Sequence, residues 1–427
     1  MTTMIDKARR LKNEGQIDSA ISLMEDFVSK SPEENIGAHR YLAYLLVRKG
    51  DKEGALKVLM QGVKNNPANL WLKMMLGDFY YFELKDANKA SSIYKELLIS
   101  FKQPERSTMS PYRYILKRLS IISFEEKNYE EAEKYFELFY ALEPSDFYGS
   151  DFRHFAEVLL KNGKKDKAKQ VLLAGVKSHP GDNELYKFAQ NIFPEVPFQY
   201  REKISRGHIN GVEKIPIKTP IIKEGDDIYS IIDEATKGIR EKNDIITVSS
   251  CVVAIAEERV YTVDTIRVSR VARIVSHFVS HKNVPFGGAA PLANPASMEI
   301  AIREVGKPRI ILGTIAGAIG KTLRKSGWFY VVAGPQSALI DDPPAAIPPY
   351  DYSVIPGPKD SFAAANEIKN KTGLDAAIID ANDIGAAWAV GYTSRVNKDK
   401  LEVALSDNPA GNEDQQTPIV IVRGLIT

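Results

Sequence analysis

The sequence predicts a multidomain protein in which an all-α superhelical solenoid is followed by an α+β domain. Two observations indicate this. An alanine recurs five times in the first half, at intervals of 35, 35, 42 and 36 residues, and in four cases a proline follows twelve residues later. Near Pro194, helical periodicity gives way to short β-branched runs punctuated by glycine and proline. We therefore expect a helical repeat domain at residues 1–197, a linker at 198–213 and an α+β domain at 214–427.

Each repeat is predicted to be a pair of helices. The small alanine lets neighbouring helices approach closely, and the proline ends the second helix because the residue before a proline disfavours the α conformation. We expect a lengthened loop at Lys102 to Met109 and a closing cap helix at Asp182 to Phe193. These repeats resemble tetratricopeptide repeats, and their paired positions are Ala20/Pro32, Ala55/Pro67, Ala90/Pro104, Ala132/Pro144 and Ala168/Pro180.

Composition excludes several classes of protein. A net charge of +2 gives no electrostatic case for a nucleic-acid partner or an acidic membrane surface. Cys251 is the only cysteine, which rules out an intrachain disulfide and argues against a cysteine-based zinc site. Met1 to Arg10 carries charge instead of the apolar core of a signal peptide. No run approaches the ~20 apolar residues needed to span a bilayer. We expect a cytoplasmic protein without a membrane partner.

In the second half, β-branched runs predict strands and amphipathic spacing predicts helices. The expected strands are Asp244 to Val253, continued by Ala254 to Tyr261, then Arg309 to Leu312, Trp328 to Ala333, Asp375 to Asp380 and Pro418 to Arg423. The expected helices are Ile228 to Lys242, Ser269 to Val279, Pro295 to Val305 and Ser361 to Thr372.

A glycine-rich segment, Gly313 to Thr322, ends in Gly-Lys-Thr after a predicted strand. A phosphate-binding P-loop requires a glycine at the position that Ile315 occupies here, so that pattern fails. A glycine-rich turn opening a helix is one interpretation. A looser phosphate contact through backbone N–H groups and Lys321 is the other.

Two acidic segments could hold a divalent cation, because hard cations prefer oxygen ligands. Asp341 and Asp342 follow a predicted strand and precede two prolines. The segment Asp380-Ala381-Asn382-Asp383 follows a predicted strand, and Asp380 and Asn382 would share one face if that strand continued. The alternative for the first pair is a solvated turn. The alternative for the second segment is helix N-capping by Asn382 or Asp383.

Taken together, the segments of the second half resemble the γ-glutamyl ligase of the deazaflavin coenzyme F-420. The resemblance starts at Lys214 and covers about half of the chain, with its blocks in the family's order. The matching blocks are Ile215 to Pro220, Gly225 to Ile228, Asp244 to Arg259, Ala338 to Asp341 and Ala377 to Trp388.

The resemblance implies an enzyme that uses GTP and Mg²⁺ or Mn²⁺ to activate a substrate carboxylate, to which glutamate is then joined through an amide bond. It implies a metal site at Asp341, Asn382 and Asp383, with Asp380 as an additional carboxylate ligand. Lys218 and Thr219 match the family's N-terminal nucleotide segment and, with Lys321, are weaker nucleotide-binding candidates. The identity of the acceptor is open.

The chain departs from the family where nucleotide contacts are expected. Ala254-Ile255 replace Ser-Lys, and neither replacement can donate a hydrogen bond from its side chain. Ala386 replaces the arginine of the Gly-Arg-Pro-Trp motif, and Pro343-Pro344 replace a Ser-Asn pair. The leading hypothesis is a carbon–nitrogen ligase whose solenoid recruits a partner protein. The alternative is a catalytically silent ligase-like scaffold, and a weaker third is an F-420-binding, reductase-like module. The family also implies a possible homodimer.

Overall fold

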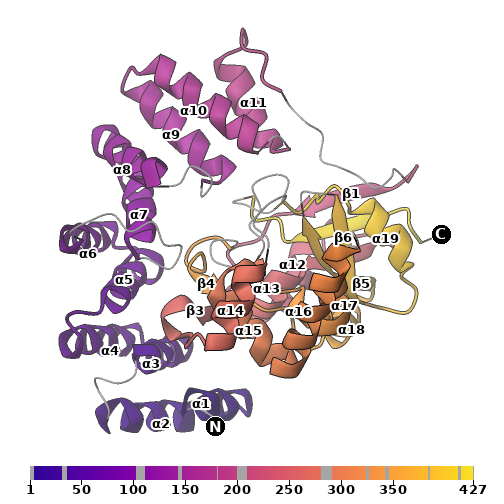
Figure 1. Ribbon diagram of the computed structural model, residues 1–427, viewed down its shortest axis with the longest axis horizontal. Helices are drawn as coiled ribbons and strands as arrows, with labels where there is room; N and C mark the ends of the chain where they lie inside the picture. Colours follow the sequence, from indigo (N-terminus) through magenta and orange to yellow (C-terminus); the bar gives the residue numbers. More distant parts are fainter. Residues whose placement is uncertain are drawn as a thin grey trace. The chain divides into compact units, whose positions relative to one another are not determined.

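The computed structural model describes residues 4–30, 36–101, 111–142, 147–179, 181–199, 209–279, 291–323, 327–341, 346–382, 385–411 and 415–426. It divides into two compact units, Met1–Asp146 with Glu157–Lys165, and Phe147–Ala156 with Asp166–Thr427. The helical first part and the mixed second part confirm the predicted fold class (Figure 1). No helix in the described ranges combines the length and apolarity needed to cross a bilayer.

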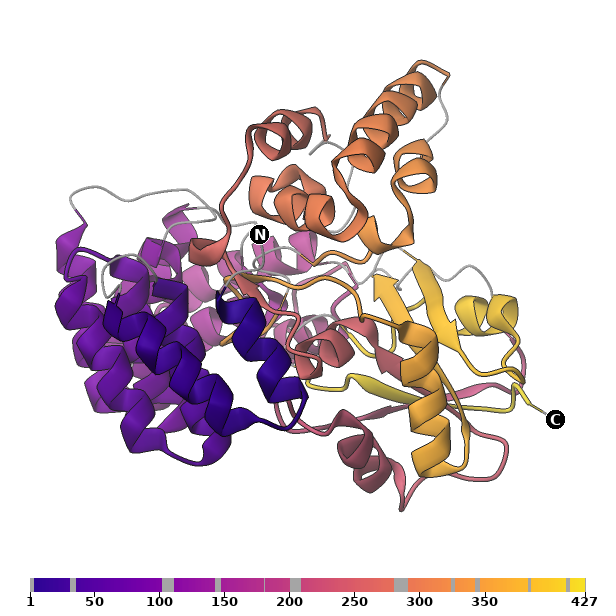
Figure 2. The ribbon, with the colours of Figure 1, turned by 90° about the horizontal axis from the view of Figure 1, so that it is seen from below.

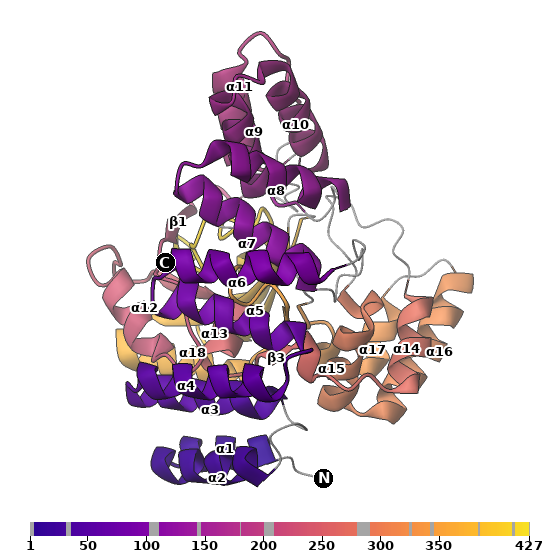
Figure 3. The same cartoon turned by 90° about the vertical axis from the view of Figure 1, so that its left-hand side faces the viewer.

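The first unit is a run of helix pairs in which each helix packs on the next (Figure 3). A short π-helix, η1 (Phe79–Glu83), continues α5. The helices are α1 (Met4–Asn13), α2 (Ile17–Lys30), α3 (Ile36–Lys49), α4 (Lys52–Asn65), α5 (Leu70–Asp78), α6 (Ala87–Ser100), α7 (Pro111–Glu125) and α8 (Tyr129–Leu142).

Three further helices follow in the sequence, α9 (Gly149–Lys161), α10 (Lys165–Ser178) and α11 (Asn183–Ile192). Asp182 caps α11 at the predicted position, through bonds from the backbone N–H groups of Glu184 and Leu185. Pro67 lies in the turn after α4, whereas the other four repeat prolines and the predicted loop at Lys102 to Met109 lie outside the described residues. The five repeat alanines are all fully buried on the second helix of a pair, at Ala20, Ala55, Ala90, Ala132 and Ala168.

A five-stranded sheet forms the centre of the second part, with the strand order β1-β7-β2-β5-β6 (Figure 2). β2 and β5 pair in parallel, and the other three pairings are antiparallel. β1, β2 and β5 consequently run in the same direction. The strands are β1 (Glu213–Ile217), β2 (Ile245–Ser249), β5 (Asp375–Asn382), β6 (Ala386–Tyr392) and β7 (Ile419–Arg423).

Helices cover both faces of this sheet. Apolar side chains of α12 (Ile228–Thr236), α13 (Ser250–Ala256) and α18 (Ser361–Thr372) form one core with Ile246, Val248 and Ile378 of the strands. On the opposite face, Leu401 of α19 (Lys398–Ala404) packs in a second core with Ile245, Ala377 and Ile379.

A helical segment is inserted between two short paired strands, β3 (Tyr261–Thr262) and β4 (Ser353–Val354). α15 packs against both α14 and α16, and α16 packs mainly on α17. The helices of this segment are α14 (Arg270–Phe278), α15 (Pro295–Val305), α16 (Lys307–Thr322) and α17 (Trp328–Ala333).

Several predicted strands are wrong. Arg309 to Leu312 and Trp328 to Ala333 lie in helices α16 and α17. Short apolar runs do not distinguish strand from helix by periodicity. The strand predicted for Asp244 to Val253 ends at Ser249, and much of its predicted continuation at Ala254 to Tyr261 is the helix α13 and the turn that follows it.

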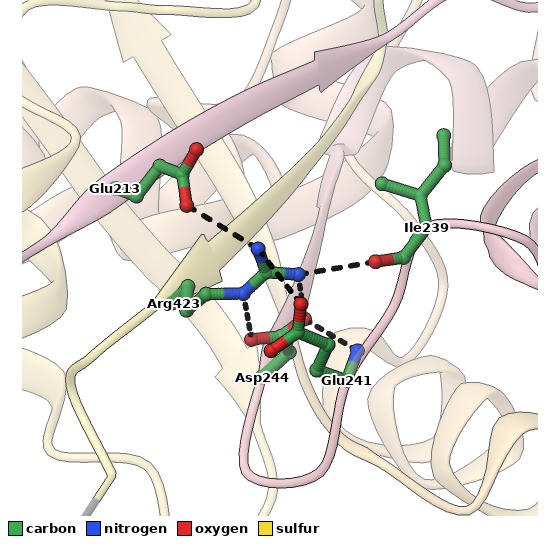
Figure 4. Close-up of polar contacts among 5 residues, drawn as sticks. All are labelled: Glu213, Ile239, Glu241, Asp244 and Arg423. Carbon is green, nitrogen blue, oxygen red and sulfur yellow. Dashed lines mark hydrogen bonds and ion pairs between the residues drawn. The ribbon is translucent and has the colours of Figure 1, made fainter.

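Arg423, at the end of β7, links the residue before β2 to β1 (Figure 4). Its guanidinium donates two hydrogen bonds to Asp244, which directly precedes β2, at 3.0 and 3.1 Å, and one to the carbonyl of Ile239. It also pairs with Glu213 of β1 and with Glu241. Because Asp244 is 1% exposed, this bidentate pair satisfies a carboxylate that has almost no contact with water.

Replacing Arg423 with alanine should lower the free energy of unfolding by about 3 kcal/mol, because the buried Asp244 carboxylate loses its cation. Urea unfolding followed by tryptophan fluorescence measures this. Arg395→Ala is the control, since Arg395 is exposed and its ion pair with Asp375 is long, at 3.5 Å. It should cost less than about 1 kcal/mol. Equal losses in the two variants would contradict the interpretation.

Candidate functional site at the carboxyl edge of the sheet

The ends of three strands meet at one edge of the sheet. β1, β2 and β5 point the same way, so Lys218, Ser249 and Asn382 all lie at the edge where these strands finish. Ligands of open α/β sheets commonly bind outside the carboxyl ends of strands. The sequence-predicted segments at 218–219 and 380–382 therefore share an edge, with three interstrand steps of ~4.8 Å between β1 and β5.

Asp380 and Asn382 lie at the C-terminal end of β5. The strand continues through Asn382, so the two side chains share a face, as the sequence predicted. This is the face of Ile378, which α12, α13 and α18 cover. The alternative of helix N-capping by Asn382 is wrong. Its Oδ1 instead accepts a hydrogen bond from the backbone N–H of Ala386 at 3.1 Å, across the β5–β6 connection.

Asp341 reaches the same neighbourhood from a distant part of the chain. It forms an isolated β-bridge with Ile355, in which its backbone donates a hydrogen bond of 2.8 Å and accepts one of 3.1 Å. The residues before it form a 3-10 helix (Pro335–Ser337), so the apolar stretch expected there is not a strand. The bridge holds Asp341 beside the core that contains Ile355 and borders Cys251.

Cys251 interacts with both carboxylates. It is in the first turn of α13, directly after β2, whose Ser249 pairs with Ile379 of β5. Burial raises the pKa of the Cys251 thiol well above its usual range, and the charge of Asp341, a hydrogen bond with Asp341 and the charge of Asp380 raise it further. The thiol therefore stays protonated and serves as a hydrogen-bond donor to the carboxylate.

The electrostatics of Asp380 show that the two aspartates interact. Burial raises the pKa of Asp380 to about 7, and the negative charge of Asp341 contributes to the shift. Two carboxylates that share a poorly solvated site resist simultaneous ionisation. A divalent cation would remove this repulsion, so these residues fit a hard metal ion.

The remaining candidates are placed less completely. Asp342, Asp383 and the prolines at 343 and 344 lie outside the described residues. Within the described part of the chain, no three Asp, Glu, His or Cys side chains form a cluster able to hold a metal ion.

Of the nucleotide candidates, Lys218 is exposed at the end of β1. Thr219 is buried, and its backbone N–H donates to the carbonyl of Gln416 at 2.9 Å. The Gly313 to Thr322 segment is not a turn after a strand, because it lies inside α16. Lys321 is in the last turn of that helix, and its side chain is outside the described set, so its role stays a prediction.

Sequence reasoning missed Cys251 at the site and Glu257 at the other end of α13. Cys251 was considered only for disulfides and zinc, yet the parallel pairing of β2 with β5 brings it to Asp380. Glu257, at the end of α13, accepts a hydrogen bond of 2.7 Å from the backbone N–H of Lys359, and burial raises its pKa. Glu257 lies in the block from Asp244 to Arg259 that resembles the ligase family, and this resemblance could have drawn attention to it.

The geometry defines a mixed α/β domain with partly buried carboxylates at a strand edge, joined to an array of helix pairs. Comparison with known families agrees: residues 216–395 match the model of the F420-0:Gamma-glutamyl ligase family. The chain thus joins tetratricopeptide-like repeats to a domain similar to that family. None of the curated proteins matches this chain.

Solved structures match the helical part only weakly. A tetratricopeptide repeat protein from Parabacteroides merdae is 19% identical, with 44% of this chain and 71% of that chain covered and a TM-score of 0.35. MamA from AMB-1 is 16% identical, with 45% and 99% covered and a TM-score of 0.30. YrrB, a TPR protein with an unusual peptide-binding site, is 16% identical, with 44% and 90% covered and a TM-score of 0.33. These scores add no argument to the helix pairing described above.

Asp380→Asn should stabilise the metal-free protein at pH 8 but not at pH 4.5. The folded-state pKa of about 7 lies above the usual value near 3.8, so the native state of the wild type loses stability as the pH rises through this window. Asparagine removes the cost of ionisation. With EDTA present, urea unfolding at the two pH values should show a gain on the order of 1 kcal/mol at pH 8 only.

Asp375→Asn provides a control of opposite sign. Burial opposes ionisation of Asp375, but hydrogen bonds from Lys369 and Thr393 lower its pKa below the usual value. Its ionised form therefore stabilises the fold above the unfolded pKa, and this stabilisation is lost as the pH falls through the folded pKa. This variant should be destabilised at both pH 4.5 and pH 8. A gain at pH 8 for Asp375→Asn, or none for Asp380→Asn, would contradict the assignment.

Proposed function

We propose that the second part of the chain is a divalent-metal- and GTP-dependent γ-glutamyl or related amide ligase, and that the solenoid recruits its partner protein. The observation that carries this proposal is the electrostatic contact between Asp341 and Asp380. These carboxylates come from segments 39 residues apart in the sequence, and the charge of Asp341 contributes to the raised pKa of Asp380. Both segments lie within the residues that match the ligase family model.

The carboxylates would hold Mg²⁺ or Mn²⁺. Asp341 and Asp380 supply two anionic oxygens, and Asn382 retains a second lone pair on its amide oxygen beside the bond to Ala386. Asp383 is proposed as a further ligand. Water and nucleotide phosphates would complete the shell, since Mg²⁺ usually keeps several such ligands. The bound ion would neutralise the phosphate oxygens during transfer.

Amide formation explains why such a site needs a nucleotide. The acceptor carboxylate attacks the γ-phosphorus of GTP and releases GDP, which gives an acyl phosphate. The amine of glutamate then attacks the acyl carbon, and phosphate leaves as the amine loses a proton. Positioning and charge neutralisation provide most of the catalysis in phosphoryl transfer. We propose Lys218 and the backbone at Thr219 as nucleotide contacts, with Lys321 a weaker candidate, and leave the acceptor open.

One observation favours the rival function, a catalytically silent scaffold. Ala254 and Ile255 occupy the positions of the family's Ser-Lys pair, and both are buried in an apolar core with Val260 and Ile355. Their side chains cannot contact phosphate. The two carboxylates favour the ligase, because their burial costs stability that a scaffold has no reason to retain.

Calorimetric titration with Mn²⁺ tests the metal site. Asp341→Asn should weaken binding at least tenfold, because it removes one of two anionic ligands. Glu234→Gln is the matched control, since it also removes one negative charge but changes an exposed residue of α12. Equal affinities for wild type and Asp341→Asn would falsify the metal assignment.

Nucleotide turnover separates ligase from scaffold. Wild-type protein with GTP, Mn²⁺, glutamate and a panel of carboxylic acids should release phosphate only when an acceptor is present. Asp380→Asn should reduce this rate at least a hundredfold, because the ion that neutralises the phosphate loses a ligand. Metal binding without turnover on any acceptor, together with capture of a protein by residues 1–197, would support the scaffold instead.

We also propose that the ligase-like domain pairs with a second copy, as the family resemblance implies. Light scattering of the full chain measures this directly, and a monomer mass would exclude it.

A further inference from the structure

The segment from residue 265 to 340, which we name the cationic insert, has a large excess of positive over negative charge. It contains ten basic residues and two acidic ones, for a net charge of +8 where the whole chain has +2. The two acidic residues are both engaged. Glu299 accepts a hydrogen bond from the backbone N–H of Ser269, and Glu304 pairs with Arg259. From Lys307 to Ile340 the sequence has no acidic residue.

The cationic insert also exposes large apolar side chains. Eight of the nineteen such side chains in the described part of the chain lie between residues 307 and 333, so they form a concentrated surface. Val331 is 81% exposed and Leu312 57%. Along α16, the exposed residues at 311, 315, 319 and 323 recur every four positions and form one stripe. The eight are Ile311, Leu312, Ile315, Ile319, Leu323, Tyr330, Val331 and Val332.

Tight packing on the other side of α16 keeps this stripe facing outward. A Cβ atom at Gly313 would lie 3.0 Å from the carbonyl oxygen of Phe329, and one at Gly317 would lie 3.3 Å from the Cβ of Phe329. These two glycines therefore let α16 and α17 lie side by side at short range, as Gly-x-x-x-Gly pairs do between packed helices (Figure 2). The stripe cannot turn inward without breaking this contact.

α14 presents the same combination of charge and apolarity. Ile274 is 60% exposed and Phe278 68% exposed, and Arg270 and Arg273 are exposed on the same helix. Both α14 and α16 pack on α15. Two helices that pack on α15 thus display apolar side chains beside basic residues. Among the residues that the structure describes, neither Lys307 nor Arg309 has an ion-pair partner.

We propose that the cationic insert docks on an anionic lipid surface, with the apolar stripe of α16 and the adjoining face of α17 entering the headgroup–acyl boundary. Amphipathic helices with basic residues and Leu, Ile or aromatic side chains bind anionic bilayers in this way. α16 has 16 residues, which is too few to span a bilayer. The protein would therefore lie on the surface. The net charge of the whole chain conceals this local charge, because the other residues sum to −6.

Charge favours a lipid over the other occupants. A second copy of the insert would bring together two segments that each have a net charge of +8 in the sequence, which is repulsive. Nucleic acid would neutralise the cations. However, bases stack on aromatic side chains in such sites, and the Ile and Leu side chains of the α16 stripe offer no aromatic ring. Acyl chains accept aliphatic side chains, and anionic headgroups accept the arginines and lysines.

Vesicle co-sedimentation of the full chain tests the proposal. Vesicles of phosphatidylcholine with 30% phosphatidylglycerol should bind the protein at least tenfold more tightly than pure phosphatidylcholine. Raising the salt from 0.1 to 0.5 M should weaken the binding, because exposed charges are screened. Ile315→Ser combined with Val331→Ser should reduce binding at least tenfold. Both positions are exposed, so circular dichroism should show an unchanged fold.

Ile99→Ser is the matched control, because Ile99 is an equally exposed apolar residue, at 85%, on α6. It should bind vesicles like the wild type. The proposal is overturned if wild type ignores anionic vesicles or if Ile315→Ser with Val331→Ser binds like Ile99→Ser. It is also overturned if light scattering shows that the double variant only dissociates a dimer, or if the insert binds RNA and not vesicles. None of these outcomes depends on ligase activity.

Discussion

The parallel pairing of β2 with β5 is the constraint on which the candidate site depends. Its register, with Ser249 opposite Ile379, brings the first turn of α13 beside Asp380. A slip of one residue would turn Asp380 and Asn382 to the face that α19 covers. The ion pair between Arg423 and Asp244 fixes the start of β2 against β7. This contact at one end of β2 helps to hold the register that positions Ser249 and Cys251 at the other end.

The same pairing buries negative charge. Asp380, Asp341 and the Cys251 thiol converge in a poorly solvated region, and the pKa values of Asp380 and Cys251 both rise. In the absence of a cation this arrangement destabilises the folded state near neutral pH. Elevated pKa values from burial plus a like-charged neighbour are typical of functional sites. Structural carboxylates in this chain behave differently, since Asp375 has basic partners that lower its pKa.

Sequence reasoning succeeded where local pattern determines structure. The repeat alanines, helices α15 and α18, and the alternation of Asp380 and Asn382 all follow from short-range periodicity. It failed for residues 309–312 and 328–333, because apolar residues on a solvent-facing helix resemble those of a buried strand. β6 was missed because its alanines and glycine carry no strand signal. Cys251 could not be assigned, because its neighbours depend on the pairing of strands 130 residues apart.

The position of Asp341 connects the two surfaces of the second part. It is the first residue after the cationic insert, and two backbone hydrogen bonds with Ile355 fix it to the segment that leads out of β4. Within the insert, α16 and α17 pack mainly on each other, and α16 also packs on α15. The bridge therefore fixes the backbone of Asp341, the proposed ligand, at the point where the insert returns to the sheet domain.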